Sequence, residues 1–207
     1  MDYIKNPMMI ETKSFEIIGQ EGHDILKGYT EEELMIIKRV IHTTADFEYG
    51  EITEIHPEAI KAAKKSFLSG KNIYADTSMI MTGVNRRRLE DLNIKVLNYV
   101  HDKDVYEVAE KEKITRSMAG IKKACKDDSI GIFAIGNAPT AIFQLKELID
   151  AGYPKPDLII GVPVGFVGAD ESKEILSDID VPYIRVNGRK GGSTVAVAII
   201  NALFKMI

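Results

Sequence analysis

Residues 130–139 carry the sequence Ile-Gly-Ile-Phe-Ala-Ile-Gly-Asn-Ala-Pro, and this stretch decides the fold class. Its first six residues contain no polar side chain, which is typical of a strand buried on both faces. Gly136 and Pro139 then favour a turn, and residues 140–151 are predicted to form a helix. A buried strand that leads directly into a helix is the repeating unit of a parallel sheet covered on both faces.

The same alternation extends in both directions from this stretch. Further strands are predicted at residues 72–75, 94–100, 157–161 and 182–186, and further helices at residues 86–92, 104–113, 115–126, 171–179 and 193–204. We therefore expect a single α/β domain over residues 1–207, with three layers, a mainly parallel five-stranded sheet and helices on both faces. In such folds ligands bind where loops leave the carboxyl ends of the strands.

Two helices are predicted before the first of these strands. Thr30 and Glu33 have the spacing of a capping box, in which each side chain binds a free amide at the helix start. Apolar residues then recur every three or four positions, which marks one buried helical face. A second helix is predicted from Pro57 to about Gly70, because proline is favoured in the first turn.

Composition excludes several classes of protein. The 207 residues are 45% hydrophobic and 28% charged, as in an ordinary globular protein, and the net charge of −4 argues against nonspecific nucleic-acid binding. No apolar run reaches the roughly 18–20 residues that cross a bilayer, and residues 1–10 lack the pattern of a secretion signal. We expect a cytoplasmic protein in which the single cysteine, Cys125, has a structural role.

The segment from Val40 to Glu48 contains the strongest candidate for chemistry, His42. Histidine moves protons near neutral pH, and the neighbouring Thr43, Thr44, Asp46 and Glu48 are suited to fixing its tautomer or ligating something. The alternative is a helix-terminal histidine bonded to a carbonyl group. The spacing of residues shows no metal site of a known type, so no metal is expected.

Three glycine-containing turns and several arginines could bind anions. Residues 136–141 open a helix whose free amides favour a carboxylate, although a simple capped turn fits the pattern equally well. Residues 161–173 contain three glycines that let the backbone approach a ligand, or form a long turn capped by Asp170. Residues 188–194 place Arg189 and Lys190 before Gly191, which is not the order of a phosphate-binding loop. Arg116 follows Thr115, which is predicted to cap a helix, and its guanidinium suits a carboxylate.

Six segments taken together resemble one family. The residues 10–18, 38–47 (which include His-Thr-Thr-Ala-Asp-Phe), 114–119, 136–141, 163–173 and 188–193 look like the successive motifs of the precorrin-8X methylmutases. The match runs in order over nearly the whole chain. It implies a flavodoxin-like sheet, a homodimer with active sites near the interface, and an isomerase of vitamin B12 (cobalamin) biosynthesis that moves a methyl group from carbon 11 to carbon 12 of a corrinoid.

The resemblance also implies roles for individual residues. The acid–base histidine of the family falls on His42, and its substrate-binding residues fall on Ser14, Arg39 and Arg116. A threonine contact made from the opposite subunit in some members falls on Asn85, which departs from that pattern but still offers an amide. Asn137, Arg189 and Lys190 are further candidates for binding the acidic side chains of the substrate. No cofactor is expected, and cobalt, if present, belongs to the substrate; the segment after His42 favours cobalt-precorrin-8.

Two other functions remain alternatives. The first is a corrinoid carrier that binds an intermediate without converting it. The second is a nucleotide-dependent transferase that uses residues 188–194, against which the order of lysine and glycines argues.

Overall fold

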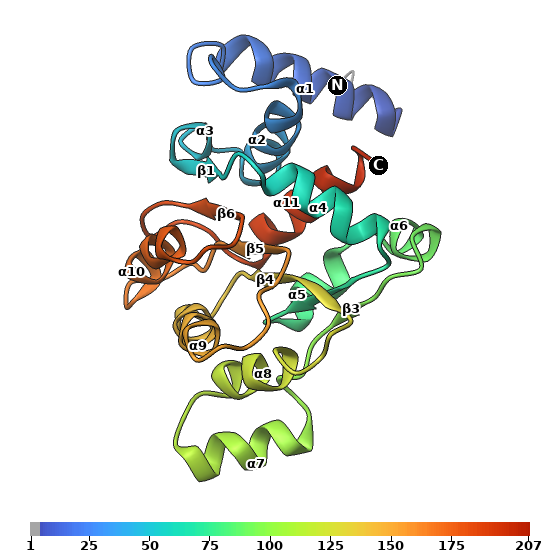
Figure 1. Cartoon of the computed structure of the whole chain (residues 1–207). Coiled ribbons are helices and arrows are strands. Elements are labelled where there is room, and N and C mark those ends of the chain that lie inside the picture. The colour runs from blue at the N-terminus through green and yellow to red at the C-terminus, as the bar shows by residue number, and fades with distance from the viewer. Residues whose placement is uncertain (1–4) are drawn as a thin grey trace.

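The computed structural model describes residues 5–207, so residues 1–4 of the segment tested for a secretion signal lie outside the described part. A six-stranded sheet in the order β1-β6-β5-β4-β2-β3 forms its centre (Figure 1). The strands are β1 (Thr53–Ile55), β2 (Asn72–Ala75), β3 (Val96–Leu97), β4 (Ile130–Ile135), β5 (Leu158–Gly161) and β6 (Tyr183–Val186). The five parallel strands, numbered along the chain, follow the order 2-1-3-4-5 of flavodoxin-like folds. The predicted α/β class and parallel sheet are confirmed.

The sixth strand, β1, is the one that the sequence did not predict. It pairs antiparallel with β6, Glu54 lying opposite Arg185. Three residues are too few to show an alternation of apolar and polar side chains, so no local pattern marks them as a strand.

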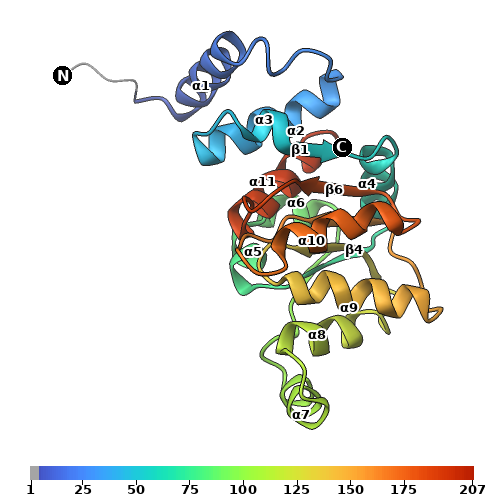
Figure 2. The same ribbon diagram turned by 90° about the vertical axis from the view of Figure 1, so that its left-hand side faces the viewer.

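The residues of each central strand alternate between two cores, because successive side chains of a strand point to opposite faces. Ile132 and Ala134 belong to the larger core, whereas Phe133 and Ile135 belong to the smaller one. Helices α4 (Ala59–Leu68) and α11 (Ser193–Phe204) cover the first face, and α2 (Glu31–Thr44) packs on the outer side of α11 (Figures 1 and 2). Helices α8 (Arg116–Ala124) and α9 (Pro139–Asp150) cover the second face.

The helices agree with most of the predictions, including α11 to the residue. Their bounds are α1 (Pro7–Glu21), α2 (Glu31–Thr44), α3 (Tyr49–Ile52), α4 (Ala59–Leu68), α5 (Ser78–Gly83), α6 (Arg86–Asp91), α7 (Lys103–Glu112), α8 (Arg116–Ala124), α9 (Pro139–Asp150), α10 (Ala169–Glu174, followed by a 3-10 turn at Ile175–Asp178) and α11 (Ser193–Phe204). The capping box before α2 is present, with the Thr30 side chain accepting from the Glu33 amide and Glu33 accepting from the Thr30 amide.

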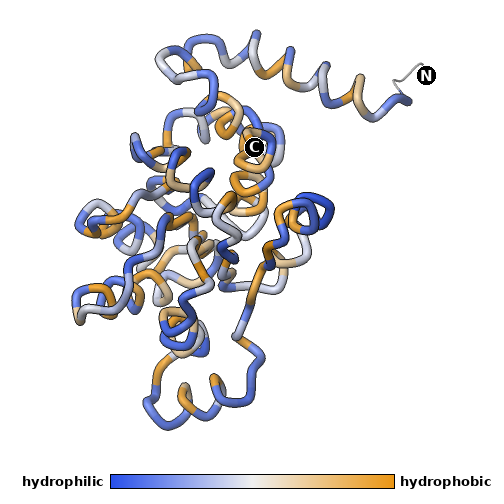
Figure 3. The backbone as a smooth tube through the Cα atoms, turned by 45° about the vertical axis from the view of Figure 1, so that its right-hand side comes forward, coloured by the Kyte–Doolittle hydropathy of each residue, from blue (hydrophilic) through white to orange (hydrophobic). Residues whose placement is uncertain are grey.

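Helix α1 was not predicted. It lies at the periphery, and hydrophobic and hydrophilic residues alternate along its tube (Figure 3). Only Ile18 of this helix is buried, so α1 lacks the apolar stripe that reveals a helix in a sequence. Within residues 5–207, no helix is both long and apolar enough to cross a lipid bilayer.

Candidate functional site

The side chain of His42 lies at the contact between α1 and α2. It is exposed in the last turn of α2, and its ring centroid is 5.3 Å from that of Phe15. Arg39, one turn earlier, places its guanidinium 4.7 Å from the centre of the same Phe15 ring. Phe15 therefore holds together the predicted acid–base residue and one predicted substrate-binding arginine, although the sequence reasoning did not single it out.

Glu11 connects this group to two helices. Its carboxylate accepts hydrogen bonds from Arg39 of α2 and, at 2.7 Å, from Lys205 just beyond α11. The Lys205 ammonium and the Arg39 guanidinium lower the pKa of Glu11 to about 2. Ser14 lies one turn after Glu11 and donates its hydroxyl proton to the Ile10 carbonyl at 2.8 Å. The structure thus brings Arg39 and His42 together at the contact of α2 with α1, and Ser14 lies next to Phe15 in α1.

None of the four polar neighbours of His42 hydrogen-bonds to its ring within residues 5–207. Thr43 and Thr44 donate instead to the carbonyls one turn earlier in α2. Asp46 and Glu48 accept from the ammonium of Lys190. The expectation that these side chains fix the tautomer of His42 is therefore wrong for the single chain, because each has a nearer partner.

An open pocket of about 330 Å³ lies beside Arg39, between α1, α2 and the end of α11. Its walls are apolar at Phe15, Leu34 and Met35 and cationic at Lys38, Arg39, and Lys205, with Glu31 and Ala202 completing the lining. Its volume lies at the lower end of the roughly 300–1,000 Å³ typical of small-molecule sites. A pocket of this size and charge suits part of a large anionic ligand.

The turn after β4 already holds an anion of the chain itself. Asp76, only 3% exposed, accepts hydrogen bonds from the backbone amides of Gly136, Asn137 and Ala138 at 2.8–2.9 Å. Burial raises the pKa of the Asp76 carboxyl, while the three amides act in the opposite direction. Asp76 therefore occupies the amides of the turn at residues 136–138, whereas the start of α9 (Pro139–Asp150) has no side-chain cap, and a ligand carboxylate at that helix start stays a prediction. The exposed side chain of Asn137 stays a prediction.

The turn after β6 carries the two predicted cations, which have different surroundings. Lys190 is bound to Asp46 and, at 2.7 Å, to Glu48; these carboxylates raise its pKa. Arg189 is exposed and lies over the ring of Phe166, with 5.5 Å between the guanidinium carbon and the ring centre. Arg189 is therefore the cation more available to a ligand, whereas Lys190 ties this turn to the segment after His42.

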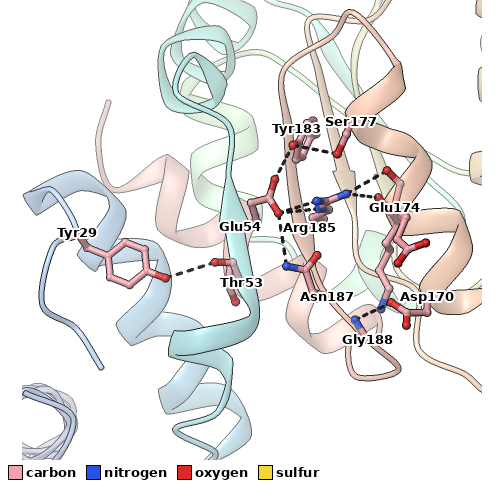
Figure 4. Close-up of polar contacts among 11 residues, drawn as sticks. Tyr29, Thr53, Glu54, Asp170, Glu174, Ser177, Tyr183, Arg185, Asn187 and Gly188 are labelled. Atoms are coloured by element: carbon pink, nitrogen blue, oxygen red, sulfur yellow. Dashed lines mark hydrogen bonds and ion pairs between the residues drawn. The ribbon is translucent and has the colours of Figure 1, made fainter. Parts of the chain in front are cut away.

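Helix α10 contacts the same turn from the side, and Glu54 of β1 accepts a hydrogen bond from Asn187 at its start (Figure 4). Asp170 accepts from the Gly188 amide at 2.8 Å, and Lys173 donates to the Lys190 carbonyl at 2.9 Å. Lys173 has no exposed surface, and burial lowers its pKa to about 8. Glu54 of β1 binds Arg185 through both Nε and Nη2, at 3.0 and 2.7 Å. These contacts place the turn firmly at the carboxyl edge of the sheet.

The other two predicted residues lie away from His42. Arg116 begins α8 after the Thr115 cap; its guanidinium binds the Tyr106 hydroxyl and lies 4.8 Å from the centre of that ring. Asn85 caps α6 by accepting from the Arg88 amide at 3.2 Å, and its amide group remains exposed. In Figure 1, α8 and α2 lie on opposite sides of the sheet. A single chain therefore does not bring Arg116 and His42 into one pocket.

Cys125 and metal chemistry play no visible part in these groups. Burial raises the pKa of the Cys125 thiol to about 12, which makes it a poor nucleophile and agrees with a structural role. Among residues 5–207, no cluster of three or more histidine, cysteine or acidic side chains is arranged to hold a metal ion.

Comparison with known proteins decides the family. The family model "Precorrin-8X methylmutase" matches residues 9–206. The chain belongs to this family. A cobalt-precorrin-8 methylmutase from Priestia megaterium is 48% identical over 95% of this chain and 87% of its own length, and one from Leptospira interrogans is 43% identical over 94% and 91%. A precorrin-8X methyl mutase structure from Thermus thermophilus is similar to this fold, with a TM-score of 0.86 and 37% identity, covering 95% of this chain and 96% of that one.

Proposed function

We propose that this protein is an isomerase of cobalamin biosynthesis that moves a methyl group from carbon 11 to carbon 12 of cobalt-precorrin-8, giving cobyrinic acid. The observation that carries the proposal is an exposed His42, without a hydrogen bond to any residue in the range 5–207, beside Arg39 and a cation-lined pocket in a chain of this family. The cobalt-containing substrate is favoured because the relatives at 48% and 43% identity are both named for it.

The reaction requires little of the protein beyond binding and proton transfer. The bond to carbon 11 breaks as the bond to carbon 12 forms, so no atom, electron or proton is gained overall. In this proposal His42 lends a proton or a hydrogen bond to the macrocycle near the migrating methyl and recovers it afterwards. Such general acid–base assistance is typically worth about 10²–10⁴ in rate. The protein supplies no cofactor, and cobalt enters as part of the substrate.

The acidic side chains of the substrate are proposed to bind arginines and neutral polar groups. Arg39, which is half-buried, and Arg116 and Arg189, which are exposed, offer guanidinium groups that bind carboxylates with two parallel hydrogen bonds. Ser14, Asn85 and Asn137 offer neutral polar groups, of which Asn85 and Asn137 are exposed. Lys190 acts mainly through its ion pairs, which hold the segment after His42 in place.

A homodimer in the cytoplasm is proposed as the working form. Two observations support the dimer. Helix α8, which begins at Arg116, and helix α2, which carries His42, lie on opposite sides of the sheet, so a second copy is needed to unite these residues, and α1 exposes Met8, Met9 and Ile10. Contiguous exposed apolar surface of this kind is typical of an interface.

The test is an absorbance time course of cobalt-precorrin-8 with wild type, His42→Ala and a control, His101→Ala, which alters an exposed histidine elsewhere. We expect wild type and the control to form cobyrinic acid, and His42→Ala to be slower by about 10²–10⁴. Full activity in His42→Ala would remove the assigned role. Binding without conversion by wild type would favour the carrier function.

A further inference from the structure

The loop of residues 164–168, between β5 and α10, exposes the two most solvent-accessible large apolar side chains of the described residues. Phe166 is 85% exposed and Val167 is 89% exposed. Leaving neighbouring apolar side chains in water is unfavourable, and such surfaces usually mark a place where something binds. The fold itself does not cover this loop tip.

Contacts at the base of the loop place its tip at the carboxyl edge of the sheet. Gly165 donates its amide hydrogen to the Arg189 carbonyl at 3.1 Å, which joins the loop to the turn after β6. At the other end, a Cβ atom on Gly168 would lie 3.4 Å from the Phe143 ring and 3.7 Å from Pro139, so the loop abuts the start of α9. The tip therefore stands between the turns that carry Asn137 and Arg189.

The chemistry of the tip combines an apolar surface with a cation. The Arg189 guanidinium lies 5.5 Å from the centre of the Phe166 ring, and both side chains are exposed. An aromatic ring beside an arginine suits a flat apolar ring system that carries carboxylates at its rim. A protein partner fits less well, because a stable interface takes about 800 Å² from each partner and this tip offers little more than two side chains.

We propose that Phe166 and Val167 form the surface against which one face of the corrinoid ring packs, while Arg189 binds a carboxylate on the rim of that ring. The inference rests on the proposed function for the identity of the ligand. It assigns a substrate-binding role to two residues for which neither capping nor core packing provides a reason.

The test measures binding of cobyrinic acid to the full chain by isothermal titration calorimetry. The variants are Phe166→Ala, Phe166→Leu and, as a matched control, Leu68→Ala, which removes an exposed apolar side chain at the opposite edge of the sheet. We expect Phe166→Ala to bind about 10–100-fold more weakly and Phe166→Leu to lie between it and wild type. Leu68→Ala should bind as wild type does, and all variants should keep their melting temperature because the altered side chains are exposed.

Each outcome decides the inference. Unchanged affinity in Phe166→Ala would overturn it, as would a loss of affinity that follows dissociation of a dimer in sedimentation, because the tip would then be a contact between copies. A wild type that binds cobyrinic acid through Phe166 but does not convert cobalt-precorrin-8 would refute the proposed function and support this inference. Absence of any binding to wild type would overturn both.

Discussion

The turns after β4 and β6 lie side by side at one edge of the sheet, but the first binds a buried carboxylate and the second carries an exposed cation. A Cβ atom on Gly136 would be 2.9 Å from the Cα of Ser193, so the two backbones touch and only glycine fits there. The amides of Gly136, Asn137 and Ala138, in the turn before α9, bind the buried carboxylate of Asp76. Neither α9 nor α11 has a side-chain cap, and the start of α11 stands beside the exposed Arg189.

The turn after β4 therefore contributes to stability, whereas the turn after β6 keeps a surface that can bind a ligand. The crevice between β2 and β4 is the point where the strand order reverses, and flavodoxin-like folds bind ligands there. Here the amides of residues 136–138 bind the Asp76 carboxylate of the chain itself, so these amides are not free to bind a phosphate. The neighbouring turn after β6 keeps its surface open and is held by side chains from α10.

The largest expected effect comes from removing the Asp76 carboxylate that binds the turn after β4, at residues 136–138. Asp76→Ala leaves three amides, two of them buried, without an acceptor and should lower the free energy of unfolding by about 3 kcal/mol or more, as measured by urea denaturation. Asp180→Ala, which removes an exposed carboxylate paired with Lys155, is the control and should leave stability almost unchanged. Inorganic phosphate should restore part of the stability of Asp76→Ala and leave wild type unaffected. Equal free energies of unfolding for the two variants would show that the bonds between Asp76 and the turn after β4 contribute little to stability.

A smaller effect is expected from Lys173, which donates a hydrogen bond to the turn after β6 at the Lys190 carbonyl. The pKa of Lys173 is about 8 in the fold, against an ordinary value of 10.5, because burial disfavours the charged form. Between these values the unfolded chain holds more protons, so this group makes stability rise with pH from about 8 to 10.5. The rise is on the order of 1–3 kcal/mol. Urea titrations across that window should show a smaller slope for Lys173→Met than for wild type, while Lys155→Met, at an exposed site, should keep the slope.

The smallest effect concerns the attachment of α1 to the rest of the fold through the ion pairs of Glu11 with Arg39 and Lys205. The pKa of Glu11 is about 2 when bound to Lys205 and Arg39, against an ordinary value of 4.5. Its stabilising contribution is therefore fully present above about pH 4.5 and is lost as the pH falls toward 2. Hydrogen exchange of the α1 amides should become faster over that range in wild type. Glu11→Gln should exchange faster already at pH 6 and depend less on pH; identical profiles would mean that these ion pairs do not hold α1.

Some residues of the candidate site could be predicted from the sequence, whereas the contacts that hold the turns after β4 and β6 could not. His42, Arg39 and Ser14 were predicted from their resemblance to family motifs, and the structure brings His42 and Arg39 together against Phe15 of α1, the helix that also carries Ser14. The contact of Asp76 with the turn after β4 was missed, although an acidic residue directly after a buried strand is a signal that could have been followed. The surroundings of Lys190 were missed because its partners precede it by more than 140 residues.

By itself, the sequence determined the elements whose signals are local. The capping box of Thr30 and Glu33, the buried strand at residues 130–135 and the helix from Ser193 to Phe204 each depend on side chains a few positions apart. Only the tertiary structure decided that β1 pairs with β6, that Asp76 closes the turn after β4 and that Phe166 remains uncovered. These outcomes depend on groups far apart in the chain, whose meeting is set by packing of the whole sheet and leaves no periodic pattern in the sequence.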